Sequence, residues 1–137
     1  MKRLFIAAAL LFSLILASCG GGGGGASTTI NVTMTDFQFQ PNHFTVPAGQ
    51  EIKFNASNNG GVVHNFVIMK LGTTAGDMFD NEDVPNVYWE TELQPGGSAN
   101  TTFTAPPDPG EYEIVCKTGG HIAAGMVAKL TVVPAGK

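Results

Sequence analysis

Short runs of alternating polar and apolar residues, separated by turn residues, are the feature of this chain that most limits its fold. In residues 51–56 apolar side chains alternate with polar ones, and the same pattern recurs at 64–68, 112–116 and 128–132. A period of two is typical of strands with one buried face. The glycine, proline and asparagine residues between the runs are typical of turns. We therefore expect an all-β fold, a Greek-key antiparallel β-sandwich. Residues 73–89 break the alternation and are assigned no element.

The first 19 residues carry the pattern of an export signal. Residues 1–3 are a short basic start, residues 4–16 are apolar apart from Ser13, and Leu-Ala-Ser-Cys stands at 16–19. Basic, apolar and small-residue regions in this order are typical of a secretory signal peptide. The last four residues resemble the lipobox of bacterial lipoproteins, in which the cysteine is lipidated and becomes the mature N-terminus. The alternative is a plain signal peptide with an incidental cysteine.

This interpretation divides the chain into three parts. We expect a lipoprotein signal peptide at 1–18, the lipidated Cys19 with a glycine-rich flexible tether at 19–29, and one folded domain at 30–137. A lipid chain holds a protein at a membrane surface without a spanning helix. The protein is therefore expected outside the cytoplasm, lipid-anchored to the bacterial cell membrane on its periplasmic or outer face.

The charge of the mature chain limits its partners. The sequence has 7 basic and 11 acidic residues, and Lys2 and Arg3 leave with the signal peptide, which brings the net charge to −6. Such a surface argues against nucleic acid as a partner, because nucleic-acid binding needs a basic face. Six of the acidic residues lie in the segment 77–92. They form either a solvated loop or a docking patch for a basic redox protein.

Cys116, His121 and Met126 are evenly spaced, with four residues between each pair. The residues between them are small or flexible, so one loop can turn all three side chains toward one point. A thiolate, an imidazole and a thioether suit copper, and His64 can supply the second imidazole that a trigonal copper site needs. Each residue also has a plainer interpretation: Cys116 as a core thiol, His64 as a core histidine and Met126 as packing.

Position in the strands and the cysteine count both bear on these alternatives. His64 and Cys116 fall on the apolar faces of their runs, near strand ends, so we expect a pocket at one end of the sandwich, shielded from water. If Cys19 carries lipid, Cys116 has no disulfide partner. A free cysteine outside the cytoplasm then needs another role, and metal ligation is such a role.

Together these residues resemble the cupredoxin family over residues 30–133 and are most similar to its bacterial azurin and auracyanin groups. The resemblance is carried by Phe-Thr-Val-Pro-Ala-Gly at 44–49, Val-His-Asn at 63–65, Pro-Gly-Glu-Tyr at 109–112 and the Cys-His-Met loop. It implies a cupredoxin-like sandwich with one type 1 copper per chain. His64, Cys116 and His121 would be the strong ligands and Met126 the weak axial ligand.

The resemblance also implies which residues surround the metal. Asn65 would tie the ligand loop to the preceding strand, and the carbonyl of Val63 would approach the metal. Azurin-type loops usually have Thr/Ser-Phe-Pro after the cysteine, whereas this chain has Lys-Thr-Gly at 117–119. Thr118 is then the candidate hydroxyl partner of Asn65. The backbone N–H restored at Gly119 is expected to donate to the cysteine sulfur.

We interpret the chain as a membrane-tethered blue-copper protein that carries electrons between redox partners and is not an enzyme. The expected partners are a cytochrome or a membrane electron-transfer complex, and the protein is expected to be a monomer. Because His43, His64 and His121 are the only histidines, no ligands remain for the second copper of a copper oxidase or nitrite reductase. The main alternative is a copper-delivery or copper-scavenging lipoprotein, and a further one is a binding module without a metal.

Overall fold

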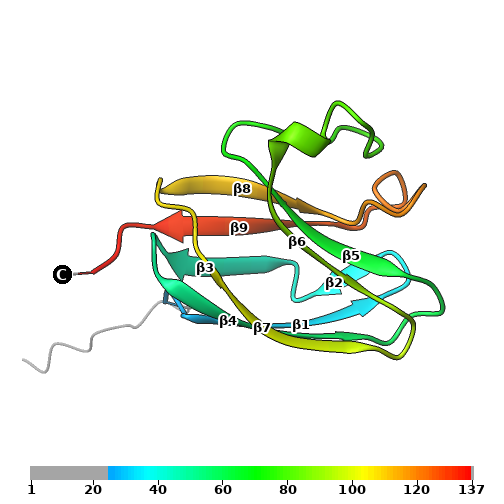
Figure 1. The fold of residues 1–137 in the computed structure, drawn as a ribbon, viewed down its shortest axis with the longest axis horizontal. Helices are drawn as coiled ribbons and strands as arrows, with labels where there is room; N and C mark the ends of the chain where they lie inside the picture. The colour runs from blue at the N-terminus through cyan, green and yellow to red at the C-terminus, as the bar shows by residue number, and fades with distance from the viewer. Residues whose placement is uncertain (1–24, 137) are drawn as a thin grey trace, which may run out of the picture.

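The computed structural model describes residues 25–136, which form two β-sheets packed face to face (Figure 1). One sheet has the strand order β2-β1-β4-β7 and the other has the order β3-β9-β8-β5-β6. The strands are β1 Thr29–Thr35, β2 Gln38–Gln40, β3 His43–Pro47, β4 Glu51–Asn58, β5 His64–Met69, β6 Val87–Leu93, β7 Ser98–Thr104, β8 Gly110–Val115 and β9 Val127–Val133. The expected all-β sandwich is confirmed. Two of its pairings are parallel, β1 beside β4 and β3 beside β9.

The predicted signal peptide, the predicted lipidated Cys19 and most of the predicted tether lie in residues 1–24, outside the described residues. The first described strand, β1, begins at Thr29, one residue before the expected start of the folded domain.

The alternation of β4 shows how the sequence builds the core. Its inward side chains are buried while those between them face outward, because successive side chains of a strand point to opposite faces. Phe54 is the centre of the aromatic packing, with its ring centroid 4.9 Å from that of Phe66 and 5.0 Å from that of Trp89. Edge-to-face contacts of this kind add about 0.5–1.5 kcal/mol each beyond the burial of apolar area.

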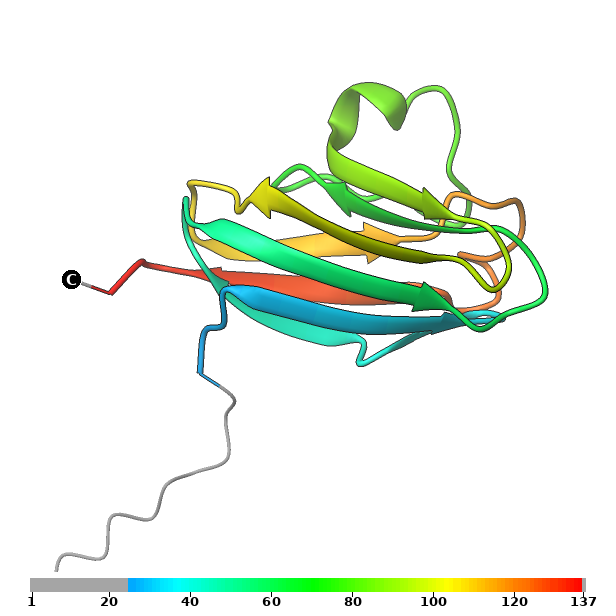
Figure 2. The same cartoon turned by 60° about the horizontal axis from the view of Figure 1, so that its bottom comes forward.

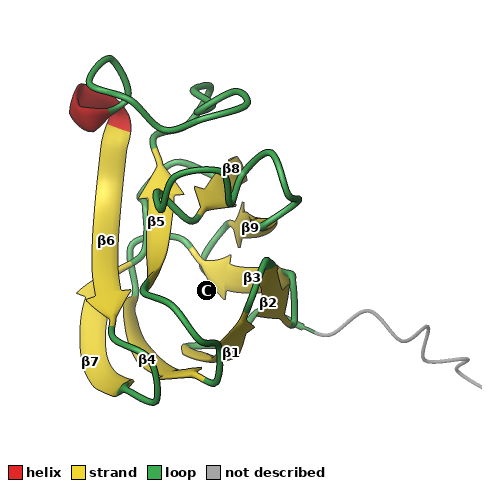
Figure 3. Ribbon diagram, turned by 90° about the vertical axis from the view of Figure 1, so that its right-hand side faces the viewer, coloured by secondary structure: helices red, strands yellow, loops and turns green. Residues whose placement is uncertain are grey.

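β5 departs from alternation, because all six of its residues are buried. Its inner face joins the main core, and its outer face packs with Ala75 and Ile122 in a second apolar cluster that also contacts Phe79. The connection between β5 and β6 covers this outer face (Figure 3). It contains the short 3-10 helix η1 Val84–Asn86. In the described part of the chain, no helix is long and apolar enough to cross a membrane.

The segment 73–89, which the sequence pattern left unassigned, is thus a cover for one sheet followed by the start of β6 at Val87. Its apolar residues are irregularly spaced because they fit the surface of β5 as a loop and follow no helical or strand period. Two of its four acidic residues, Asp80 and Asp83, have side-chain hydrogen bonds within the segment. Asp83 is buried and its Oδ2 accepts the Asp80 N–H, and Asp80 Oδ1 accepts the N–H of Glu82.

Three loops meet at one end of the sandwich, opposite the C-terminus (Figures 1 and 2). They are the turn 36–37 after β1, the connection 59–63 after β4, and the loop 116–126 after β8. The connection 59–63 is shaped by Asn58, whose buried side chain donates from Nδ2 to the carbonyls of Val62 and Leu93 and accepts the N–H of Gly60. This end of the molecule carries the predicted site.

Candidate metal centre

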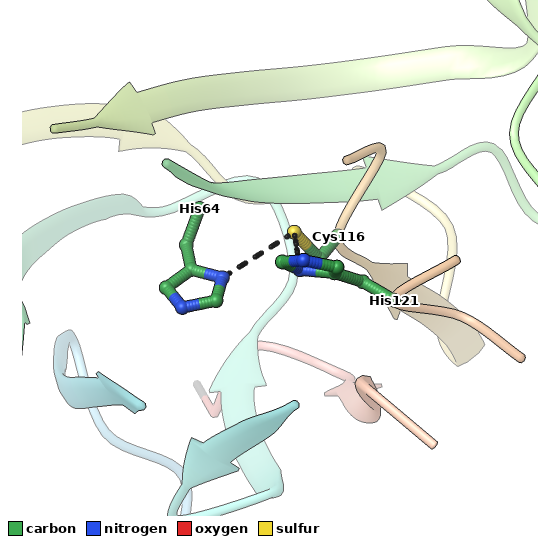
Figure 4. A group of neighbouring side chains, drawn as sticks. All are labelled: His64, Cys116 and His121. Atoms are coloured by element: carbon green, nitrogen blue, oxygen red, sulfur yellow. Dashed lines mark hydrogen bonds between the residues drawn. The ribbon is translucent and has the colours of Figure 1, made fainter. Parts of the chain in front are cut away.

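His64, Cys116 and His121 come together in the structure, with one donor atom from each lying within 4.8 Å of the others. His64 is the first residue of β5, Cys116 follows the last residue of β8, and His121 lies on the loop beyond it. The Nδ1 atoms of both imidazoles face the sulfur, at 3.8 Å for His64 and 3.3 Å for His121 (Figure 4). The exposed fractions are 0% for His64 and Cys116 and 5% for His121. Three soft or borderline donors thus lie together in the buried interior of this end of the sandwich.

Met126 ends the same loop, and its backbone closes the loop on the other two residues. Its N–H donates to the His121 carbonyl at 2.9 Å, and its own carbonyl accepts the Cys116 N–H at 3.3 Å. The side chain is fully buried. Gly125, just before it, has a φ of +96°, a conformation that a glycine adopts at little cost. The equal spacing in the sequence therefore corresponds to one compact loop folded around the sulfur.

Thr118 and Asn65 link this loop to the strand that begins with His64. Thr118 Oγ1 lies 2.9 Å from the Val63 carbonyl and 3.1 Å from Asn65 Oδ1. Asn65 Nδ2 donates to Glu92 Oε2 at 3.0 Å. The residues that the resemblance named around the metal thus form one hydrogen-bonded group beside the cysteine.

The expectation that Gly119 donates to the sulfur is wrong. The backbone donor to Cys116 Sγ is Asn65 N–H, at 3.4 Å. Gly119 lies on the exposed outside of the tight turn in which the His121 N–H donates to the Thr118 carbonyl. Because that turn points Gly119 toward solvent, the N–H that glycine provides in place of proline does not reach the sulfur. The hydrogen bond to the sulfur comes instead from Asn65 on the neighbouring strand β5.

Two residues at the site were missed by the sequence analysis. Asp36 Oδ1 lies 3.2 Å from His64 Nε2, and the ring of Phe37 meets the ring of His121 edge-on, with centroids 5.2 Å apart. Both stand in the two-residue turn between β1 and β2. An aspartate in a turn directly after an alternating run was the available signal, but period-two patterning does not say which loops meet across a sandwich.

The two histidines differ in their outer nitrogens. His64 Nε2 faces a carboxylate, whereas His121 Nε2 has no hydrogen-bond partner among residues 25–136. Every buried side-chain nitrogen or oxygen in this range has a hydrogen-bond partner. Because His121 Nε2 has no partner, it is not buried and reaches the surface. Burial lowers the pKa of His121 and the neighbouring His64 lowers it further, against an opposing effect of Asp36. The neutral imidazole, which is the metal-binding form, is therefore favoured.

The donor set fits copper. A thiolate with two imidazoles and a nearby thioether residue is the combination used by mononuclear blue-copper sites. Calcium and magnesium are disfavoured, because they require oxygen donors and no carboxylate belongs to the converging group. The two imidazole nitrogens and the sulfur lie within 4.8 Å of one another. These residues can therefore hold a copper ion between them.

Comparisons with known proteins agree with this geometry. The Cupredoxin-like domain family matches residues 4–132. The chain is 32% identical to the copper-resistant cuproprotein CopI of Rubrivivax gelatinosus, over 76% of this chain and 66% of that protein. It is 38% identical to the chloroplastic plastocyanin of Oryza sativa subsp. indica, over 69% of this chain and 54% of that protein. It therefore spans between about half and two thirds of these curated relatives.

A solved structure extends the likeness to three dimensions. The dithionite-reduced auracyanin of the photosynthetic bacterium Roseiflexus castenholzii superposes with a TM-score of 0.69 at 36% identity, covering 80% of this chain and all of that one. The family match, the two-sheet fold and the converging His-Cys-His group agree with one another, and the chain belongs to the cupredoxin family.

Proposed function

We propose that the protein is an electron carrier that binds one type 1 copper through His64, Cys116 and His121, with Met126 as the weak axial ligand. The observation that carries this proposal is the buried group in which both Nδ1 atoms face the cysteine sulfur. Copper, when bound, supplies a one-electron Cu(II)/Cu(I) couple. Nothing among the described residues suggests a second reacting centre, so we infer transport of electrons rather than catalysis.

The surrounding residues keep the ligands in place while the charge of the metal changes. His64 belongs to a strand that is packed on both faces, and Cys116 continues directly from β8. The sulfur accepts a hydrogen bond from Asn65 N–H, which reduces its negative charge and supports Cu(I). A framework of this kind moves little between oxidation states, and a small rearrangement favours fast electron exchange.

We propose that electrons enter and leave through the His121 edge. His121 is the ligand whose outer nitrogen reaches the surface, whereas His64 is fully buried behind Asp36. The partner would be a cytochrome or a membrane electron-transfer complex. Within the acidic region 77–92, Glu90 pairs with Lys117 and Glu92 accepts a hydrogen bond from the neutral amide of Asn65, whereas Asp77 and Glu82 are exposed. These contacts favour a structural role for Glu90 and Glu92.

We further propose that Cys19 carries the lipid that anchors the protein outside the cytoplasm. The support is the lipobox-like sequence at 16–19, which lies outside the described residues. The test is the mass of the N-terminal peptide from membrane-extracted protein. A peptide beginning at Cys19 with attached lipid supports the anchor, and an unmodified Cys19 contradicts it.

The alternative of copper delivery or scavenging has one observation in its favour, the similarity to a copper-resistant cuproprotein. The burial of all three donors argues against it, because a protein that hands over copper needs an accessible site. The two functions differ in whether copper stays bound through a redox cycle.

One experiment tests the proposed function. Cu(II) is added to the full chain in detergent, and the visible spectrum and copper content are measured before and after cycles of reduction and reoxidation. An intense blue band, one copper per chain and full recovery after each cycle are expected. A pale protein, or copper that passes to a chelator within one cycle, would instead favour copper handling.

A further inference from the structure

The turn between β1 and β2 places a carboxylate on the outer nitrogen of one candidate copper ligand. Thr35 pairs with Gln38 across the turn, which leaves Asp36 and Phe37 as its two central residues. Asp36 Oδ1 lies 3.2 Å from His64 Nε2. The Gly61 N–H donates to both carboxylate oxygens, at 3.0 and 3.3 Å. The carboxylate is therefore held by the backbone of one loop within hydrogen-bond distance of the imidazole.

Gly60 is the residue that makes this approach possible. A Cβ added there would overlap Asp36 Oδ1 and lie 2.6 Å from His64 Nε2, which is closer than atoms that are not bonded can approach. At the neighbouring Gly61 an added Cβ would meet Asp36 Oδ2 at 3.5 Å, an ordinary contact. Glycine is therefore required at residue 60, where a side chain would fill the space between the carboxylate and the ring. Residue 61 has room for a side chain.

We propose that Asp36 is a positioning residue that fixes the orientation and tautomer of His64 and stabilises Cu(II) relative to Cu(I). An ionised carboxylate only accepts hydrogen bonds, so the proton of the neutral ring stands on Nε2. The lone pair is then on Nδ1, the atom that faces Cys116 Sγ. Carboxylates that accept from a ligating histidine are known to orient the ring and raise its basicity.

The charge of Asp36 acts in the same direction on the metal. A negative charge close to a ligand stabilises the more positive Cu(II) state, although solvent screens it because the Asp36 side chain is 49% exposed. His121 has no such partner among the described residues. This inference rests on the proposed copper site for its effect on the reduction potential, but its effect on the imidazole exists without any metal.

The first test uses the copper-free full chain and measures the ¹⁵N chemical shifts of His64, at a pH where the rings are neutral. The native protein should show the Nε2–H form alone. Asp36→Ala should show a mixture of the two tautomers, and Asp36→Asn should keep the native form, because its side-chain carbonyl still accepts. A single Nε2–H form in Asp36→Ala would overturn the positioning role.

Gly60 supplies a second route to the same result that leaves the charge in place. Gly60→Ala should separate the carboxylate from the ring and give the mixed tautomers, whereas Gly61→Ala should keep the native form. Identical spectra for the two alanine variants would contradict the steric argument. Both variants retain Asp36. A change seen only in Gly60→Ala would therefore show that the tautomer depends on the contact between the carboxylate and the ring, and not on the charge of Asp36 alone.

The second test measures the equilibrium ratio of Cu(I) to Cu(II) at one applied potential. Asp36→Asn should raise this ratio by about threefold, which is about 28 mV at 59 mV per tenfold change for a one-electron couple. Glu51→Gln removes the same charge from the far end of β4, roughly 20 Å along the strand from the site, and should leave the ratio unchanged. Equal shifts in the two variants would overturn the proposed effect on copper.

The outcomes separate this inference from the proposed function. If the native chain forms no blue copper complex, the electron-carrier proposal fails, and the ¹⁵N measurement still decides whether Asp36 sets the tautomer. If the native chain is blue and both tests on Asp36 show no change, the carrier proposal stands and the role of Asp36 is overturned.

Discussion

The two histidines of the site are held by different kinds of structure. His64 begins a strand that is buried on both faces, and its outer nitrogen faces the carboxylate of Asp36. His121 lies on a loop, and its outer nitrogen reaches the surface beneath the ring of Phe37. The comparison indicates a division of roles within one metal site. In the function that we propose, the strand side would set the geometry and the charge around the metal, and the loop side would provide access for a partner.

One turn serves both sides of this comparison. Asp36 contacts one histidine and Phe37 the other. Phe37 has a φ of +70° and is 46% exposed, although a left-handed conformation costs a residue with a side chain about 1–2 kcal/mol. The surrounding β1–β2 pairing keeps the ring over His121 despite this cost. The same turn therefore contacts both the rigid and the accessible halves of the site.

The largest expected effect is the removal of the atom that both histidines face. Cys116→Ala should abolish the intense visible band completely, because Cys116 is the only cysteine among residues 25–136, and the measurement is the absorption spectrum after addition of Cu(II). Met69→Leu changes a buried sulfur in the second apolar cluster and should leave the band intact. A blue Cys116→Ala protein would contradict the ligand assignment.

The second prediction tests the two histidines directly. His121→Gly should regain a blue band when free imidazole is added, because its ring stands next to the surface. His64→Gly should regain much less, because its ring is fully buried behind Asp36. The measurement is the absorbance recovered as a function of imidazole concentration. Equal recovery in both variants would remove the distinction between a buried and an accessible ligand.

The third prediction concerns the link between loop and strand. Thr118→Val removes the hydroxyl that joins the loop to Val63 and Asn65 and should lower the free energy of unfolding of the copper-free chain by about 1–2 kcal/mol. Urea denaturation measures it. Thr102→Val is the control, since Thr102 is exposed on β7. A loss no larger than that of the control would show that the loop is held without this hydroxyl.

The smallest expected effect is at the ion pair that attaches the loop to β6. Lys117 Nζ lies 2.9 Å from Glu90 Oε2, with side chains 33% and 41% exposed. Lys117→Gln should lower the free energy of unfolding by less than about 1 kcal/mol, and the difference should shrink as salt is added. The visible spectrum should not change. A shifted spectrum would mean that this pair also helps to position the ligands on the loop.

Much of the site could be predicted because its ligands leave local signals. Cys116, His121 and Met126 lie on one loop and their spacing is visible in the sequence. The inward direction of His64 follows from the alternation of β5. Asp36 and Gly60 could not be found in this way, since their contact joins the end of β1 to the connection after β4. Such contacts depend on strand order and register, which periodicity does not encode.

The sequence by itself determined the sandwich class, the family and the residue types around the metal, because alternation and ligand spacing are properties of short segments. Tertiary structure alone decided that the segment 70–86 covers β5, that Asn65 rather than Gly119 donates to the sulfur, and that a carboxylate meets His64. The physical reason is the same in each case. These contacts arise where separate loops converge at one end of two packed sheets, and their partners are chosen by the packing of the whole molecule.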